Sequence, residues 1–216
     1  MQSRKVIQNA SVKTNPKRGS VASCSSVGIV PVTFQELWDN FYGEKEPPYK
    51  VNGEVPEGFE NQCAIRMSLT FHRVGVQMIT FSSKYVKPEN KEASIGRLLF
   101  SGLATSTRAN ELAQWLNTRP ICGIGSAQNI TGKDWKSKIK GKTGIIYFDG
   151  FWARDGLEEI NSIMTGGHID LWNKSELTPS RNNLPRFLLG IDSMNNIFYQ
   201  YSDYGKSKRI LFFEVK

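Results

Sequence analysis

The chain has 216 residues, of which 39% are hydrophobic and 22% are charged, and this composition is that of a globular protein rather than a disordered tail. No apolar run approaches the roughly 20 residues that a membrane-spanning helix needs, so we expect no insertion into a membrane. The chain contains only two histidines, which excludes a histidine-rich metal site. Any histidine-based catalysis must therefore use His72 or His168.

The net charge is +8 and the isoelectric point is about 9.4. A basic protein favours anionic partners such as nucleic acid, anionic lipid or the bacterial cell wall. The densest basic cluster, residues 133–142, holds five lysines but few aromatic residues. Surfaces that bind nucleic acid interleave basic and aromatic side chains. The pattern therefore favours charges spread over a solvated surface, and we expect no nucleic-acid partner.

Three cysteines, Cys24, Cys63 and Cys122, leave at least one thiol unpaired in a monomer. They form no CxxC pair, so neither a zinc ribbon nor a thioredoxin-type motif is supported. A disulfide between Cys24 and Cys122 is compatible with the sequence, which does not specify it.

The first 32 residues are rich in polar and basic side chains and show no helical period. We interpret residues 1–32 as a flexible basic arm and residues 33–216 as a single domain. The arm contains no apolar segment of the kind that a secretory signal peptide requires. We therefore expect synthesis in the cytoplasm without such a signal.

The first helix is predicted for residues 34–42. Thr33 and Glu36 have the spacing of a capping box, in which each side chain accepts a hydrogen bond from the other residue's backbone N–H. Four apolar residues then form one stripe at helical spacing: Phe34, Leu37, Trp38 and Phe41. Gly43 predicts the end of the helix.

The next apolar segment, residues 63–71, follows a predicted loop at 43–60 and is ambiguous. Its apolar residues alternate as in a strand, whereas Cys63, Met67 and Phe71 also share one helical face. A second helix is predicted for residues 107–117, ending before Pro120, with four residues facing inward: Ala109, Leu112, Ala113 and Leu116.

Four strands are predicted in the rest of the chain, at residues 144–148, 168–172, 197–201 and 209–215. We expect Asp149-Gly150 to close the first of them. Because helices come first and strands follow, the sequence predicts an α+β fold with N-terminal helices packed on an antiparallel sheet.

Cys63 and His168 form the sharpest candidate site. A catalytic cysteine acts as a thiolate, which a helix N-terminus and a neighbouring imidazolium both favour. If residues 63–71 are helical, Cys63 lies in the first turn, where backbone N–H groups are also available as an oxyanion hole. His168 opens a predicted strand after two glycines. The order of cysteine followed by histidine is that of papain-like enzymes. From spacing alone, an inert buried cysteine and a structural histidine remain the simpler interpretation.

The residues around this pair carry a more specific signal. Asn61-Gln-Cys63-Ala-Ile-Arg-Met-Ser68 and Gly167-His168-Ile-Asp-Leu-Trp-Asn173 resemble the two active-site blocks of the type VI secretion amidase effectors of the fourth family. Phe34-x-x-x-Trp38-x-x-Phe41 resembles the opening helix of that family, and Lys142-Thr-Gly-Ile-Ile146 resembles the strand before its catalytic histidine. The similarity extends from about residue 33 to residue 173, with a looser C-terminal part.

The resemblance implies an NlpC-type papain-like cysteine amidase domain that hydrolyses the bond between D-glutamate and diaminopimelate in peptidoglycan stem peptides. It implies Cys63 as the nucleophile, His168 as the general base, a helix at 63–72 and a structural role for His72. It also implies delivery by a secretion apparatus component into the periplasm of a target cell, and a cognate immunity protein. Neither a metal nor a cofactor is expected.

The third catalytic residue departs from the family pattern, which has an aspartate about eleven residues beyond the histidine. That place falls near Pro179 in this sequence. Asp170 shares a strand face with His168, because side chains repeat every two residues along a strand, and it is our candidate. Asn173 and Glu176 are weaker candidates.

Two other functions stay open at this point. A non-catalytic, basic cell-wall-binding module on the same fold would keep the charge without needing the thiol. A nucleic-acid-binding protein would show DNA binding that weakens steeply with salt.

Overall fold

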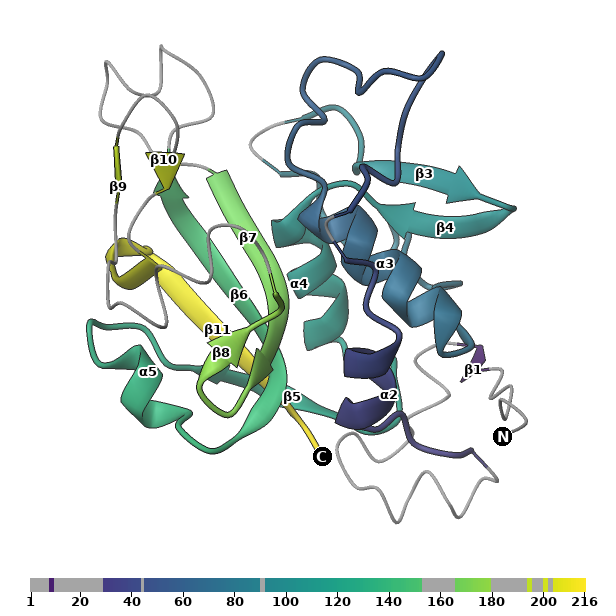
Figure 1. Ribbon diagram of the computed structural model, residues 1–216. Coiled ribbons are helices and arrows are strands. Elements are labelled where there is room, and N and C mark those ends of the chain that lie inside the picture. Colours follow the sequence, from purple (N-terminus) through teal and green to yellow (C-terminus); the bar gives the residue numbers. More distant parts are fainter. Residues whose placement is uncertain are drawn as a thin grey trace.

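The computed structural model describes residues 8–9, 29–43, 45–89, 92–152, 166–179, 194–195, 200–201 and 204–216. The fold is α+β, as predicted, and its centre is a five-stranded antiparallel sheet (Figure 1). The strands lie in the order β5 (Ile124–Asn129), β11 (Arg209–Val215), β6 (Thr143–Trp152), β7 (Gly166–Asn173) and β8 (Glu176–Leu177).

The helices are short and lie on both sides of this sheet. Their bounds are α2 (Phe34–Asp39), α3 (Cys63–Arg73), α4 (Ala109–Asn117), α5 (Trp135–Lys138) and the 3-10 turn η1 (Tyr204–Lys206). Three small strand pairs complete the described elements: β1 (Gln8–Asn9) with β2 (Val76–Gln77), β3 (Arg97–Phe100) with β4 (Leu103–Ser106), and β9 (Met194–Asn195) with β10 (Gln200–Tyr201). No helix in these described ranges is long and apolar enough to cross a membrane.

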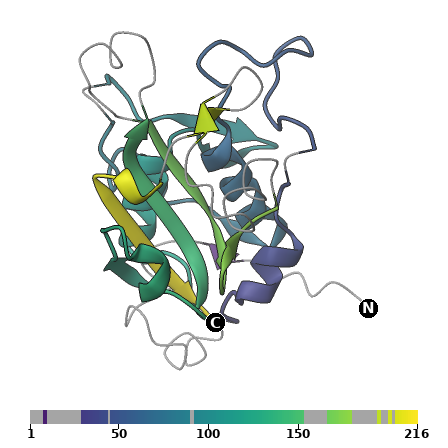
Figure 2. The same cartoon turned by 60° about the vertical axis from the view of Figure 1, so that its left-hand side comes forward.

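Alternate residues of the central strands build two separate cores. One core joins α2, α3 and α4 to one face of the sheet, through residues such as Phe71, Trp115, Tyr147, Ile169 and Leu171. The other joins α5 and η1 to the opposite face, through Trp135, Phe148, Trp172, Tyr204 and Phe212. Helix α3 lies beside β7 in both views, and the two elements are in contact (Figures 1 and 2). Both faces of the sheet are therefore covered, and β7 runs between the two cores.

Helix α2 begins as predicted but ends earlier. The capping box is present, since Thr33 Oγ1 accepts from the Glu36 N–H at 3.3 Å and Glu36 Oε2 accepts from the Thr33 N–H at 2.8 Å. The predicted end at residue 42 is wrong, because Asn40 leaves the helical conformation and its side-chain amide donates to the Glu36 carbonyl at 2.8 Å. An asparagine that bonds a backbone carbonyl in this way competes with helix continuation.

The ambiguous segment is helical over Cys63–Arg73, and the second predicted helix begins two residues late, at Ala109. The expectation that Asp149-Gly150 closes a strand is wrong, because β6 continues to Trp152. A bulge lies between Phe148 and Trp152, and Gly150 there has φ +60, which costs glycine little. The strand predicted at 209–215 is confirmed as β11.

Two sequence predictions fall largely outside the described residues. Most of the arm proposed for residues 1–32 is not described, although Val32 is buried in the first core and its N–H donates to the Cys122 carbonyl at 2.9 Å. Of the strand predicted at 197–201, only Gln200–Tyr201 is described, as β10.

Candidate active site

Cys63 is the first residue of α3, the position at which a helix presents backbone N–H groups without intrahelical partners. The preceding residue, Gln62, occupies the N-cap but makes no capping hydrogen bond. Its buried side chain instead bonds both backbone groups of Tyr49, each at 2.8 Å. The first turn of α3 thus keeps its N–H groups for other acceptors, while Gln62 fastens the 45–62 loop beside Cys63.

The edge of β7 opposite β6 has little strand pairing. Strand β8 pairs only with Trp172 and Asn173, so in the described part of the chain the earlier residues of β7 have no strand partner on that side. Two backbone N–H groups in this stretch serve the site. The Ile169 N–H bonds the Cys63 sulfur, together with the Ala64 N–H, and the Leu171 N–H donates to Asp170 Oδ1 at 2.7 Å. The open edge therefore supplies donors that a paired strand would have used in the sheet.

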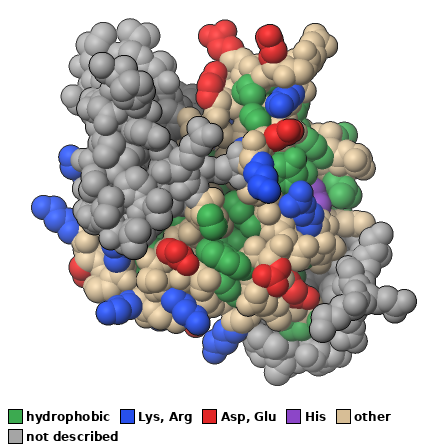
Figure 3. Space-filling model, in the orientation of Figure 1, with side chains coloured by type: hydrophobic (Ala, Val, Ile, Leu, Met, Phe, Trp, Pro, Cys, Tyr) green, Lys and Arg blue, Asp and Glu red, His purple; other side chains and the backbone are tan. Residues whose placement is uncertain are grey.

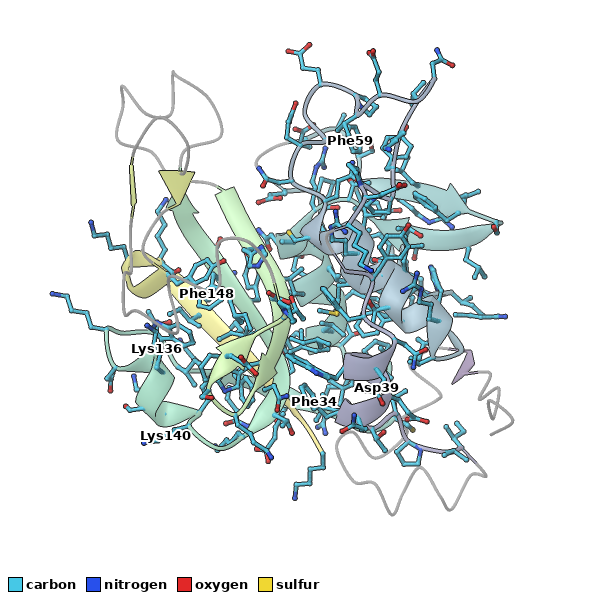
Figure 4. All side chains as sticks on the ribbon, in the orientation of Figure 1. Phe34, Asp39, Phe59, Lys136, Lys140 and Phe148 are labelled. Carbon is cyan, nitrogen blue, oxygen red and sulfur yellow. The ribbon has the colours of Figure 1, made fainter. Side chains whose placement is uncertain are left out.

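His168 lies on β7 and is hydrogen-bonded to the Cys63 thiol. Its ring is stacked on Tyr204, with centroids 5.7 Å apart and an angle of 8° between the planes. Tyr204 is stacked in turn on Phe148 at 4.1 Å and 10°. Figure 4 shows Phe148 on the side of the sheet away from α3. The three rings fix the imidazole plane, while 26% of the His168 side chain stays exposed for a substrate.

Asp170 lies two residues beyond His168 on the same strand, as the alternation predicts. Its Oδ2 is 3.5 Å from His168 Nε2, a distance within the range of an ion pair and long for a hydrogen bond. Its Oδ1 accepts hydrogen bonds from the Leu171 N–H and from the Thr178 hydroxyl, the latter at 2.6 Å. The structure therefore brings Cys63, His168 and Asp170 together.

The electrostatics of the site favour a charged pair. Burial by itself raises the pKa of Cys63, but the bond and charge of His168 and the two backbone donors lower it below its ordinary value. Burial by itself lowers the pKa of His168, but Tyr204, Asp170 and Cys63 raise it well above its ordinary value. The face of the Tyr204 ring carries negative electrostatic potential, which favours an imidazolium stacked on it. Each shift favours the charged form of its group, the thiolate for Cys63 and the imidazolium for His168.

The lowered pKa of Cys63 predicts the pH dependence of its alkylation. Thiolate is present above the lowered pKa and is lost as pH falls through it, so the rate of reaction with iodoacetamide should have its midpoint below pH 9.0, the ordinary pKa of the thiol. In His168→Ala the rise should move to higher pH, because burial then acts without the imidazolium. A wild-type midpoint at or above pH 9.0 would contradict the pair.

The other sequence candidates lie away from this cluster. His72 is nine residues after Cys63 along α3, a separation of about 13 Å. Its ring nitrogens face the Val76 carbonyl at 3.0 Å and the Thr105 hydroxyl at 3.3 Å. Glu176 is exposed on β8. Asn173 pairs with Glu176 at the far end of β7 from His168.

The remaining cysteines differ in state. Cys63 is free, whereas Cys122 is buried and disulfide-bonded. Cys24 lies outside the described residues. Over the described ranges, no group of three or more His, Cys, Asp and Glu side chains is arranged to hold a metal ion.

The roles of three residues of this site could not be predicted from the sequence. Tyr204 lies 36 positions beyond His168 in the chain, and Thr178 follows a short strand, whereas Gln62 belongs to the block around Cys63 but has no pattern that predicts its bonds to Tyr49. Only the fold brings them to the pair.

Comparison with known proteins adds a family to this geometry. The model of the family "Type VI secretion system (T6SS), amidase effector protein 4" (Tae4) matches residues 59–213, a range that includes Cys63 and His168. A search of curated proteins finds no match.

Solved structures of low sequence identity are also similar. The type VI effector Tae4 from Enterobacter cloacae is 18% identical, with 85% of this chain and 96% of that chain covered and a TM-score of 0.48. The effector Tae4 from Salmonella typhimurium, solved in complex with the immunity Tai4 from Enterobacter cloacae, is 17% identical, with 85% and 98% covered and a TM-score of 0.46. At TM-scores below 0.5 these similarities add no support to the sequence match.

Proposed function

Because the chain belongs to the type VI secretion amidase effector 4 (Tae4) family, we propose that it is a peptidoglycan amidase toxin with Cys63 as its nucleophile. The observation that carries this proposal is the Cys63–His168 pair, with the thiol at the start of α3 and Asp170 behind the imidazole. The bond that we propose as its target joins D-glutamate to diaminopimelate in the stem peptides. A helix that presents the cysteine to a histidine on a sheet also supports an NlpC-type papain-like relationship.

The reaction begins with attack by the Cys63 thiolate on the carbonyl carbon of the D-glutamyl group. The oxyanion accepts hydrogen bonds from backbone N–H groups in the first turn of α3, including that of Cys63 itself. The His168 imidazolium then donates its proton to the amine of diaminopimelate as the C–N bond breaks, which leaves a thioester on Cys63. Neutral His168 takes a proton from water, the resulting hydroxide attacks the thioester, and the carboxylic acid departs as the thiolate is restored.

Asp170 supports these steps by holding the imidazole. A carboxylate near Nε2 favours the tautomer that carries its proton there, which leaves Nδ1 to exchange a proton with the thiol and with the leaving amine. The same negative charge stabilises the imidazolium. In this assignment Asp170 orients the ring and does not itself transfer a proton.

The surface charge and the family suggest the partners. Lysines 133, 138 and 140 are exposed around α5, and Figures 3 and 4 show basic side chains pointing outward in this region. A basic surface attracts the acidic stem peptides, and salt weakens that attraction. The proposed route is synthesis in the producing cell, delivery through a secretion apparatus component and action in the periplasm of the target. A cognate immunity protein protects the producer.

Asp170→Asn should lower kcat by roughly 10²-fold to 10⁴-fold with little change in KM, because the amide keeps the shape of the side chain but not its charge. The matched control is Asp149→Asn on the neighbouring strand. Asp149 accepts a bond from Tyr147 and pairs with Arg209 at 3.0 Å, so its loss should affect stability more than activity. Equal activity of Asp170→Asn and the wild type would show that Asp170 has no part in catalysis.

The proposed function is tested by incubating purified sacculi with the protein and identifying the new chain ends by mass spectrometry. We expect a free amine on diaminopimelate and a free carboxyl on D-glutamate. A non-catalytic wall-binding module would instead sediment with the sacculi and release nothing, and this outcome would refute the amidase.

A further inference from the structure

The β7–β8 hairpin returns the chain to the site beside His168 and Asp170. Strand β8 pairs with β7 through Trp172–Leu177 and Asn173–Glu176, and the turn between them contains Lys174 at φ +60. The backbone of Lys174 is anchored in both directions, to the Gly141 N–H at 2.9 Å and to the Lys142 carbonyl at 2.8 Å. The next residue after β8 is Thr178, which the hairpin places against β7 beside Asp170.

Thr178 contacts the carboxylate and is buried. Thr178 and Asp170 are each only 3% exposed. Thr178 Oγ1 donates a hydrogen bond to Asp170 Oδ1 at 2.6 Å. A hydrogen bond to an ionised carboxylate is stronger and shorter than one between neutral groups. The Thr178 hydroxyl has one proton, which it donates to Asp170.

Asp170 Oδ1 accepts two hydrogen bonds, from Thr178 and from the Leu171 N–H. The terminal torsion of an aspartate is soft, so nothing within the side chain fixes its plane. Two donors converging on Oδ1 do fix it, and they leave Oδ2 as the oxygen that faces His168 Nε2. Without the hydroxyl, the Leu171 N–H alone would hold Oδ1, and the carboxylate plane would turn.

We infer that Thr178 is a positioning residue of the amidase, which acts on His168 through the carboxylate of Asp170. This inference rests on the proposed function, since it assigns Thr178 a place behind the proposed catalytic pair. Thr178 touches neither Cys63 nor the reacting carbonyl in this assignment. Its effect is to hold the imidazole in the orientation and protonation state that the thiol needs.

The test compares Thr178→Val, which removes the hydroxyl at nearly constant shape, with Thr178→Ser, which keeps it. For the valine variant we expect kcat to fall by roughly 10-fold to 100-fold, the size typical of a misplaced catalytic group, with KM nearly unchanged. The titration midpoint of the His168 ring, followed by NMR, should move to lower pH. Both values should return close to those of the wild type in the serine variant.

A matched control is Thr80→Val, which removes another buried threonine hydroxyl, one that accepts from Trp115 Nε1 at 3.0 Å. It should lower thermal stability without moving kcat or the His168 midpoint. If Thr178→Val does not fold, Thr178→Ala replaces it against the same serine variant.

The inference is overturned if the variant without the hydroxyl keeps the kcat and the His168 midpoint of the wild type, or if the serine variant fails to restore them. Failure of the proposed function itself looks different. In that case Cys63→Ala keeps the activity of the wild type, while the NMR midpoint still reports whether Thr178 acts on His168.

Discussion

Cys63→Ala is expected to abolish stem-peptide cleavage, with a fall in kcat of roughly 10⁴-fold or more, because no other group in the site forms the thioester. The fold should survive, since Cys63 is only partly buried at the first turn of α3 and packs against the first core without being one of its buried members. The measurement is the release of new amines from sacculi, with thermal unfolding followed in parallel.

The matched control is Ser68→Ala, on the same helix. The Ser68 hydroxyl is fully buried, donates to the Ala64 carbonyl at 2.8 Å and accepts from the Ser106 N–H at 3.1 Å. Its removal leaves a buried donor unpaired and should cost about 1–3 kcal/mol of stability with activity retained. Degradation of sacculi by Cys63→Ala at a rate comparable to that of the wild type would show that another group is the nucleophile.

His168→Ala should be about as damaging as Cys63→Ala, and the double variant little worse than either. The two side chains act as one unit, because the imidazolium makes the thiolate and also protonates the leaving amine. The expected activity of the double variant is therefore within a few-fold of the single variants, as measured by amine release under single-turnover conditions.

His72→Ala is the control for this prediction, because it is the one other histidine in the chain. Burial lowers the pKa of His72, and its ring bonds Val76 and Thr105 far from the pair. We expect a loss of stability at most. Activity that is lost in His72→Ala and kept in His168→Ala would reverse the assignment of the two histidines.

Several elements of the fold, β7 among them, were predictable because each has a strong local signal. The capping box fixed the start of α2, and the apolar alternation fixed β7 and β11. Periodicity alone left residues 63–71 undecided. Tertiary packing favours the helix over the strand, because Met67 and Phe71 are then both buried on the face of α3 that contacts the sheet and α4. The residues around Cys63 predicted a helix only through their resemblance to a family.

The contact between Asp170 and His168 was harder to foresee. Side chains two positions apart on a strand are roughly 6.5–7 Å apart, too far for an ion pair in ideal geometry. In the structure the distance from Nε2 to Oδ2 is 3.5 Å. Tyr204 stacks on one face of the imidazole, and Thr178 with the Leu171 N–H turns the carboxylate towards it.

The unforeseen part of the site depends on long-range topology. The open edge of β7 exists because β8 is only two residues long, and no periodicity in the sequence sets that length. Tyr204 reaches the imidazole from η1, the turn between β10 and β11, two strands that belong to different sheets. Such contacts are fixed by how the sheet is assembled, which a single sequence does not reveal.

The central claim is that one thiolate, at Cys63, performs the cleavage. It is tested most directly by plotting the residual amidase activity of the wild type against the number of carboxamidomethyl groups located on Cys63 by peptide mapping. We predict a linear fall that reaches zero at one group per protein. Full activity in protein that is completely modified at Cys63 would contradict it.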